Sequence, residues 1–235
     1  MEDDPALELA RSFSEVASAL WEKAEPGSVL DRIVRLCVAT ISACEHAGIT
    51  VVDGGHITSP ASSDEIHYIV DAIQAETGEG PCVDAIREHE TFYTGRLASD
   101  DRWPRFSRRA NAVTGIESIL SLRLFVKEET LGALNLYSSR PDSFDTRDTG
   151  IAAVFATHAS VAWSASQTMI DLQTGLDTRQ LIGEATGILM AREHLTSPEA
   201  FDILRRASQR LNVKLRDIAL DVVKPPGGTG QHPDP

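Results

Sequence analysis

Several features that define whole classes of protein are missing from this 235-residue sequence. No apolar run approaches the ~20 residues that a helix needs to cross a bilayer. The acidic start MEDDPALELA has no basic leader followed by an apolar stretch, as a secretory signal would have. We therefore expect a cytoplasmic protein without a membrane partner.

Cysteine and histidine are too few and too scattered for a disulfide framework or a metal site. Cys37, Cys44 and Cys82 are an odd number, and the first two lie seven residues apart on what reads as one helix, too far for a disulfide. The seven histidines show no i, i+4 pair and no cysteine partner at zinc spacing. Haem ligation by His67 or His158 is the alternative to an ordinary core or surface histidine. We expect no metal and no cofactor.

Catalytic signatures are also missing, because there is no nucleophile elbow, phosphate loop or dinucleotide fingerprint. Cys82 is the candidate sensor residue, since a thiol beside Gly80-Pro81 at the start of a helix can have a lowered pKa and react with oxidants. The alternative, which we favour, is a buried and inert cysteine. We apply it also to Cys37 and Cys44, on the apolar side of their helix.

Positive charge is scarce, with a net charge of −13, and it is unevenly distributed. Residues 1–169 carry 26 acidic and 14 basic side chains, whereas residues 170–224 carry eight of each. The stretch 203–216 holds five basic side chains and no acid: Arg205, Arg206, Arg210, Lys214 and Arg216. A local basic patch can bind phosphates despite the acidic sum, although a solvated helix face is the other interpretation.

The first two thirds of the chain alternate between helical and strand-like patterns. Strands are expected over 47–52, 56–58, 91–94, 118–126 and 131–137, and helices over 6–24, 28–45, 64–76, 83–89, 103–112 and 146–170. In 118–126 the leucines alternate with smaller or polar residues, which is typical of a half-buried strand. Strands adjacent in sequence with helices around them predict an antiparallel sheet flanked by helices.

The last third contains no strand signal and reads as three amphipathic helices. The first spans 177–192, the second has an apolar stripe at Ala200, Leu204, Ala207 and Leu211, and the third spans 215–222. Two caps fit the second helix: Ser197 with Pro198 in the first turn, or a capping box of Thr196 and Glu199. Asn212 is expected to cap the third helix. Together the patterns predict an α+β protein with a three-helix bundle at its end.

The predicted orientation of the second tail helix places its polar side chains in solvent. With the apolar stripe turned to the core, Arg205, Arg206, Gln209 and Arg210 lie opposite it, and Lys214 and Arg216 follow from the next helix. Guanidinium groups with polar neighbours suit phosphates and the exposed bases of RNA loops.

This tail resembles the ANTAR family, the RNA-binding output domain of bacterial antitermination regulators. The matching residues over 170–223 are Arg179, Ile182-Gly183, Ala185, Gly187-Ile188-Leu189-Met190, Ala200-Phe201, Leu204-Arg205, Ser208, Asn212 and Lys214-Leu215-Arg216-Asp217-Ile218-Ala219. The resemblance implies binding to paired RNA hairpin loops, as a dimer, which prevents transcription termination. Thr186 stands where many members have lysine, which removes one phosphate contact. The predicted RNA-binding residues are Arg179, Thr186, Arg205, Ser208, Gln209, Arg210, Asn212, Lys214 and Arg216.

The first ~165 residues look like a GAF domain, especially the variant that precedes ANTAR in actinobacteria. The matching residues are Gly78-Glu79-Gly80-Pro81-Cys82, Arg102-Trp103-Pro104, Ser118-Ile119-Leu120-Ser121 and Leu131-Gly132-Ala133-Leu134-Asn135-Leu136-Tyr137-Ser138. The resemblance implies a small-molecule site between the sheet and its covering helices, but the fold does not identify the ligand.

The two resemblances divide the chain into four parts: an N-terminal helix (1–25), a GAF sensor domain (26–168), an ANTAR RNA-binding domain (169–224) and a disordered tail (225–235). We expect a homodimeric regulator, not an enzyme, in which the GAF domain senses a small molecule or another signal and controls the binding of hairpin RNA. The helix from about Thr146 is expected to pass almost directly into the bundle, with Gly175 as a hinge. An Ala-rich face with Ala152, Ala159, Val161 and Ala165 is expected to contact a second subunit.

Three alternatives stay open at this point. A DNA-binding regulator would use a tight helix-turn-helix, which the long first tail helix and the ANTAR resemblance disfavour. A cysteine-based GAF enzyme such as the free methionine sulfoxide reductase is disfavoured because two of the three thiols sit in an N-terminal helix. A protein-interaction module would only dimerise through its tail, and charge reversal at Arg205 and Lys214 would leave its function unchanged.

Overall fold

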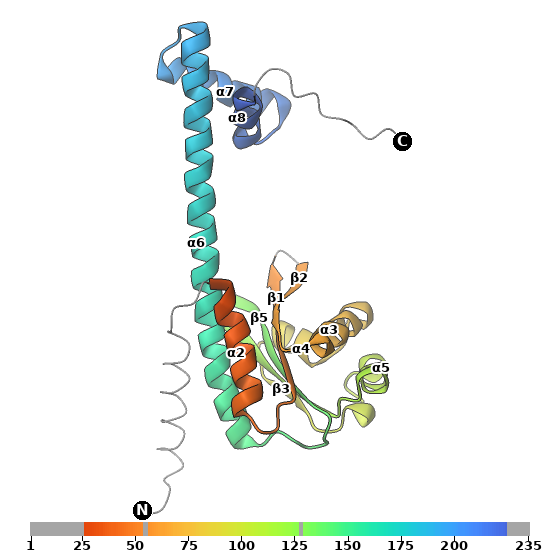
Figure 1. Ribbon diagram of the computed structural model, residues 1–235. Coiled ribbons are helices and arrows are strands. Elements are labelled where there is room, and N and C mark those ends of the chain that lie inside the picture. Colours follow the sequence, from red (N-terminus) through yellow and green to blue (C-terminus); the bar gives the residue numbers. More distant parts are fainter. Residues whose placement is uncertain (1–25, 54–55, 127–128, 225–235) are drawn as a thin grey trace, which may run out of the picture. The chain divides into compact units, whose positions relative to one another are not determined.

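The computed structural model describes residues 26–53, 56–126 and 129–224, which form two compact units that divide at Ser166 (Figure 1). The helix expected over 6–24 and the tail expected over 225–235 lie outside the described residues. Each unit is an independent cluster of contacts, and we describe the two in turn.

The first unit is built on one antiparallel sheet of five strands in the order β2-β1-β5-β4-β3. The strands are β1 (His46–Asp53), β2 (His56–Ser62), β3 (Phe92–Thr94), β4 (Ser118–Val126) and β5 (Glu129–Ser138). Strand β5 pairs with both β1 and β4, with Leu134 opposite Ile49 on one side and Leu122 on the other. The antiparallel sheet predicted from the sequence is therefore confirmed.

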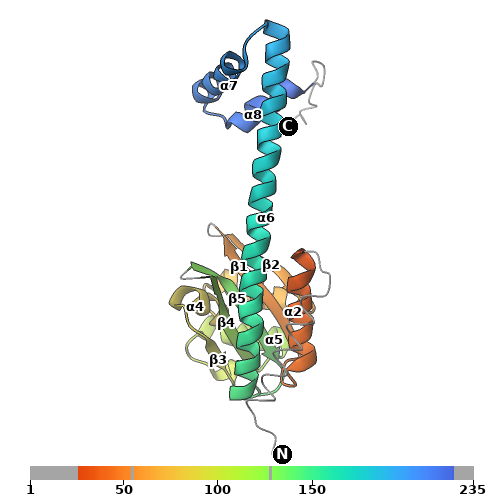
Figure 2. The same ribbon diagram turned by 90° about the vertical axis from the view of Figure 1, so that its left-hand side faces the viewer.

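Helices cover both faces of this sheet. Helix α2 (Pro26–Thr40) and the first turns of α6 (Thr146–Glu193) cover one face, and α3 (Glu65–Thr77), α4 (Pro81–Glu88) and α5 (Pro104–Thr114) cover the other (Figures 1 and 2). A short 3-10 helix, η1 (Leu97–Ser99), precedes α5. The sequence predicted that only one side of β4 is buried, and this prediction is wrong. Leu120 and its neighbours Ile119 and Ser121 are all buried between the two helical layers.

Local sequence signals account for the ends of α3, α4 and α5. The side chain of Asp64 accepts a hydrogen bond from the Ile66 N–H at 2.9 Å and so caps the start of α3. Gly78 ends the same helix with φ of 68°, a conformation that glycine adopts without strain. Helices α4 and α5 begin at Pro81 and Pro104, and the buried Trp103 beside the latter donates its indole N–H to Asp84 at 2.6 Å.

Helix α2 ends earlier than the sequence pattern suggested. It stops at Thr40, so Cys37 lies within it but Cys44 lies in the turn before β1, where its thiol donates to the His46 carbonyl at 3.2 Å. The apolar spacing continued past the helix because Ile41 and Cys44 are buried in the same core although the chain has turned. All three cysteines are free and buried.

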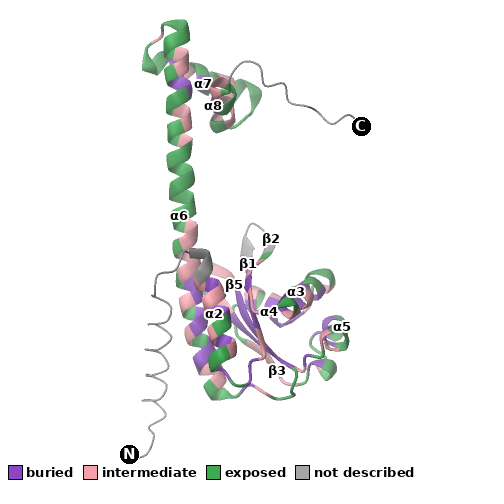
Figure 3. Ribbon diagram, in the orientation of Figure 1, coloured by how far each residue is buried: buried purple, intermediate pink, exposed green. Residues whose placement is uncertain are grey.

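Helix α6 is one continuous helix of 48 residues, where the sequence suggested two helices with a hinge at Gly175. Glycine costs only about 1 kcal/mol relative to alanine within a helix, which is too little to stop propagation between good helix formers. Residues 167–177 in this helix are almost all exposed (Figure 3).

The second unit contains the last part of α6 together with α7 (Ser197–Leu211) and α8 (Leu215–Val223). These helices pack around Ala185, Leu204 and Ala219, which confirms the predicted helical bundle. Of the two caps that fitted α7, the capping box is present, because Glu199 accepts from the backbone N–H of Thr196 at 2.9 Å.

Asn212 does not cap the third helix as expected. It ends α7 in a left-handed conformation with φ of 52°, and its N–H donates to the carbonyl of Ser208. Asparagine tolerates this conformation, so the same residue type fits either end of the short connection. The residue before α8 is Lys214.

Candidate functional sites

The first candidate site is a pocket between strand β1 and helices α3 and α4. It has a volume of about 210 Å³ and is lined by Thr50, Asp71, Gln74, Ala75, Cys82, Val83, Ile86 and Arg87. The apolar side chains come mainly from α4, which also contributes Arg87, whereas the other polar ones come from β1 and α3. The pocket therefore combines an apolar wall with one polar end.

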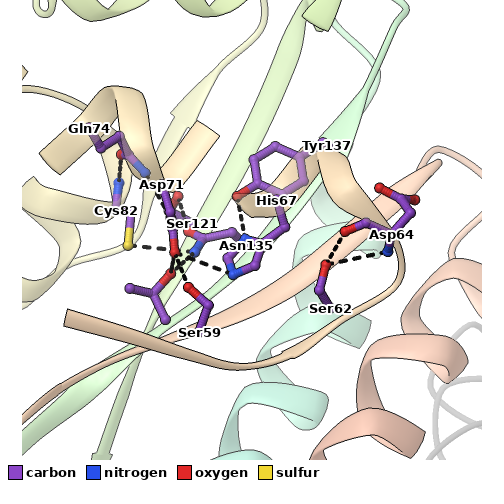
Figure 4. Close-up of polar contacts among 11 residues, drawn as sticks. Ser59, Ser62, Asp64, His67, Asp71, Gln74, Cys82, Ser121, Asn135 and Tyr137 are labelled. Carbon is purple, nitrogen blue, oxygen red and sulfur yellow. Dashed lines mark hydrogen bonds and ion pairs between the residues drawn. The ribbon is translucent and has the colours of Figure 1, made fainter. Parts of the chain in front are cut away.

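Asp71 is the charged group of this polar end, and only 8% of its surface is exposed. Its Oδ2 accepts hydrogen bonds from the hydroxyls of Thr50 at 2.7 Å and Ser59 at 2.8 Å (Figure 4). Its Oδ1 accepts one longer bond, at 3.3 Å, from the amide of Gln74. The Oδ1 atom thus keeps capacity for a further donor.

His67 and Tyr137 extend this polar group into the core. The Tyr137 hydroxyl lies 2.9 Å from Nδ1 of the fully buried His67, and Nε2 of the imidazole lies 3.3 Å from Asp71 (Figure 4). Burial raises the pKa of Tyr137, so the phenol stays protonated and its hydroxyl shares one hydrogen bond with Nδ1. Nε2 makes no hydrogen bond of good geometry within the described residues.

Burial also decides the charge of His67. It lowers the pKa of the imidazole, and the attraction of Asp71 opposes that shift without reversing it. The ring is held close to β1, since a Cβ at Gly48 would lie 2.1 Å from it. The sequence signal for this pair is the i, i+4 spacing of His67 and Asp71 on α3, a spacing that His–His and His–Cys patterns do not include.

Cys82, the candidate sensor, faces the same pocket. The side-chain carbonyl of Gln74 accepts its backbone N–H at 3.0 Å, and the Asn135 amide lies 3.5 Å from Sγ (Figure 4). Burial, followed by the charge of Asp71, raises the pKa of the thiol to about 12. The thiol is therefore protonated at neutral pH, unlike the lowered-pKa thiols of redox sensors.

The second candidate site is the basic surface of the tail bundle, and part of its charge is neutralised within α7. Asp202 pairs with both Arg205 and Arg206, the latter at 2.6 Å. The acid-free run noted in the sequence began one residue after this aspartate, so the count overlooked a neighbour that lies one helical turn away. Arg205 and Arg206 are therefore not free cations.

Other predicted RNA-binding residues are exposed and lack an acidic partner in the described part of the chain: Arg179 on α6, Arg210 on α7 and Lys214 at the start of α8. Gln209 is exposed beside them, and Arg216 lies 3.8 Å from Asp217. Arg179, Arg210, Lys214 and Arg216 thus place positive charge on the surface of the bundle.

Three predicted contact residues have structural tasks instead. Thr186 is 8% exposed and donates to the Ile182 carbonyl at 2.7 Å, so it offers little surface to an RNA. We therefore remove it from the proposed RNA surface. The Ser208 hydroxyl donates to the Val213 carbonyl at 2.6 Å, and the backbone of Asn212 closes α7.

A third feature is an apolar stripe on the exposed stretch of α6. Val161, Met169, Leu172 and Leu176 are 59–65% exposed, and their spacing places them on one side of the helix. The prediction of the face that contacts a second subunit is partly wrong, because two of its residues, Ala152 and Ala159, are buried in the core of the first unit. Val161 and Ala165 are exposed.

The described residues contain neither a metal-binding cluster nor a membrane-spanning helix. No group of three or more metal-ligating side chains lies together among them. None of their helices is long and apolar enough to cross a membrane.

Comparisons with known proteins follow the division into two units. The family model of the GAF domain matches residues 23–164, and that of the ANTAR domain matches residues 171–223. No curated protein matches the chain.

Solved structures with this fold include GAF domains and enzymes. The GAF domain of a phosphoenolpyruvate-protein phosphotransferase from Coxiella burnetii has a TM-score of 0.57 at 11% identity, covering 71% of this chain and 98% of that one. The corresponding domain from Acinetobacter gives 0.56 at 11%, covering 73% and 99%. A free methionine-R-sulfoxide reductase from Neisseria meningitidis, in complex with its substrate, gives 0.51 at 14%, covering 72% and 96%. At these identities the likeness shows the fold alone.

Proposed function

This chain belongs to the GAF domain family and contains an ANTAR domain, and from that we propose that it is a sensory regulator that binds RNA hairpin loops and prevents transcription termination. The observation that carries the proposal is the set of unpaired, exposed cations on the tail bundle, Arg179, Arg210 and Lys214, within the segment that matches ANTAR. Phosphate contacts need such cations. A regulator of this kind acts on transcripts as they are made, so we propose that it works in the cytoplasm.

The RNA surface that we propose is narrower than the sequence suggested. Its main cations are Arg179, Arg210 and Lys214, with Gln209 and Arg216 as further hydrogen-bond donors. Arg205 and Arg206 contribute less, because an RNA phosphate would have to compete with Asp202 for them. This difference gives the proposal an internal control.

The protein acts as a homodimer in this proposal. The stripe of Val161, Met169, Leu172 and Leu176 leaves large apolar side chains in water, and a second copy of α6 in parallel would bury them in a coiled-coil seam. Ile170 lies on the opposite side of the helix and outside this seam.

The first unit acts as the sensor, and its pocket beside β1 is the proposed ligand site. A ligand that prefers one state of the dimer would shift the protein between RNA-competent and silent forms. We do not propose an enzyme, because the one thiol in the pocket has a pKa of about 12 and lacks a basic partner in the described residues. GAF-fold enzymes such as the sulfoxide reductase therefore resemble it in fold only.

The experiment begins with RNA that co-purifies with the full chain, which is sequenced and resynthesised as a hairpin. Gel shifts compare this hairpin with duplex DNA of the same sequence. Preferential capture of the hairpin is expected. Equal or stronger binding of the DNA duplex would favour the DNA-binding alternative, and capture of neither would favour a protein-interaction module.

A matched pair of variants tests the surface. Replacement of Arg179, Arg210 and Lys214 by glutamine is expected to lower hairpin affinity by at least tenfold and to reduce its salt dependence. Replacement of Arg205 and Arg206 by glutamine removes two positive charges instead of three and should change affinity less for each charge removed. If the two variants lose affinity equally for each charge removed, net charge rather than this surface governs binding.

A further inference from the structure

The pocket beside β1 contains a buried carboxylate without a cation to neutralise it. No lysine or arginine lies within ion-pair distance of Asp71 in the described ranges 26–53, 56–126 and 129–224. Its neighbours are the hydroxyls of Thr50 and Ser59, the amide of Gln74 and the imidazole of His67. Hydroxyls and amides satisfy hydrogen bonds but supply no net positive charge.

His67 does not supply that charge either. Its ring is fully buried, and burial lowers the pKa of the imidazole, so it is neutral at pH 7. A buried charge that is hydrogen-bonded but not paired carries a large desolvation penalty. A cation entering the pocket would relieve that penalty, and Oδ1 of Asp71, with its single long bond, is the atom with capacity for a new donor.

The rest of the pocket indicates the body of such a ligand. Ala75, Val83 and Ile86 supply the apolar part of its lining. Arg87, the other charged residue of the lining, is mostly exposed and lies 3.6 Å from Asp84, so it is at the outer edge and already has an acidic neighbour. The cavity of about 210 Å³ limits the ligand to a small molecule.

We propose that this pocket binds a small alkylammonium compound, with its ammonium group on the Asp71 carboxylate and its alkyl body against Ala75, Val83 and Ile86. The inference rests on the proposed function, in which the first unit senses a small molecule. It adds the chemical class of the signal: an organic cation, rather than an anion or a neutral compound.

The test uses isothermal calorimetry on the full chain with n-butylammonium chloride as the probe. Sodium butyrate and butan-1-ol have the same alkyl body with negative and no charge, and potassium chloride controls for ionic strength. Butylammonium is expected to bind at least tenfold more tightly than either analogue. Equal binding of butan-1-ol, or stronger binding of butyrate, would overturn the proposal.

Variants locate the binding. Asp71→Asn keeps the shape of the side chain but removes its charge, and it should weaken butylammonium binding at least tenfold. Asp101→Asn removes an equal charge from an exposed position outside the pocket and should leave binding within twofold of the original. If Asp71→Asn binds as well as the unaltered chain, the carboxylate is not the recognition element.

A second variant guards against misfolding of Asp71→Asn. Ala75 is exposed on α3 at the pocket lining, so leucine there narrows the cavity without touching the hydrogen bonds of Asp71. Ala75→Leu should also abolish butylammonium binding, and undiminished binding by this folded variant would place the cation elsewhere. Gel shifts with hairpin RNA run separately: RNA capture without cation binding refutes only this inference, whereas cation binding without RNA capture refutes only the proposed function.

Discussion

The two units bury their polar groups to very different extents. In the first, a network from Tyr137 through His67 and Asp71 to Asn135 lies inside, between a sheet and its covering helices. In the second, the buried hydrophobic cluster among the described residues is formed by the small group Ala185, Leu204 and Ala219, and most charged side chains there lie on the surface. A sheet with both faces covered can enclose a small molecule, whereas a thin helical bundle can offer only its exterior, which suits a large polyanion.

The largest expected effect tests whether the first unit unfolds on its own. Phe155 on α6 is fully buried in the core of the first unit, so Phe155→Ala should lower the free energy of unfolding of that unit by about 3–5 kcal/mol. Scanning calorimetry should show one transition shifted to lower temperature and the other nearly unmoved. A single transition that shifts as a whole would show that the two units unfold together.

The second effect concerns the small core of the bundle. Leu204→Ala should cost about 2–4 kcal/mol, a large share of the stability available to a domain of this size, and RNA capture should be lost with the fold. Leu211→Ala on the same helix is the control, because Leu211 is mostly exposed and should cost under ~0.5 kcal/mol. Leu211 lies on the same face as Leu204 but in the last turn of α7, so similar losses in both variants would mean that this last turn is packed as tightly as the middle of the helix.

The third effect tests the exposed apolar stripe on α6, which we propose as the contact between the two copies of the dimer. Leu172→Glu together with Leu176→Glu should weaken self-association at least tenfold in sedimentation experiments, because charges would enter the proposed apolar seam. Ile170→Glu introduces charge on the opposite side and should leave the association state unchanged. Dissociation by Ile170→Glu alone would mean that another face of the helix mediates the contact.

The smallest effect concerns the thiol in the pocket. With a pKa raised to about 12, Cys82 stays protonated from pH 7 to 9, and alkylation by iodoacetamide should be slow throughout that range and rise only above it. Cys82→Ala should change RNA affinity less than twofold, with or without peroxide. Rapid alkylation at pH 7, or a peroxide response that disappears in the alanine variant, would restore a sensor role.

Sequence patterns anticipated much of the fold because they record local geometry. The period of the apolar residues predicted both the sheet strands and the tail helices. The spacing of three residues between Thr196 and Glu199 was enough to suggest the capping box. The pattern failed where the chain changed direction without a change in burial, as at Ile41 and Cys44 after α2. The prediction of a hinge at Gly175 also failed, because the helix continues through this weak helix former between stronger ones.

The candidate sites divide in the same way. Exposed cations on the tail were predictable, because an amphipathic helix fixes which side chains face water. The ion pairs within α7 are also local, but Asp202 lies one residue before the acid-free stretch 203–216 and so does not show in the charge of that stretch. The polar end of the pocket was not predictable, since Asp71 and Asn135 come from elements far apart in the chain.

The sequence by itself determined the order of strands and helices, the bundle at the end of the chain and the families to which its parts are similar, since these depend on residue spacing along the chain. Only the tertiary structure decided that Asp71 is buried with no lysine or arginine from the described residues beside it, that Cys82 is held protonated and that Thr186 is covered. Charge and reactivity in those places depend on desolvation, and desolvation is set by which distant segments pack over a side chain.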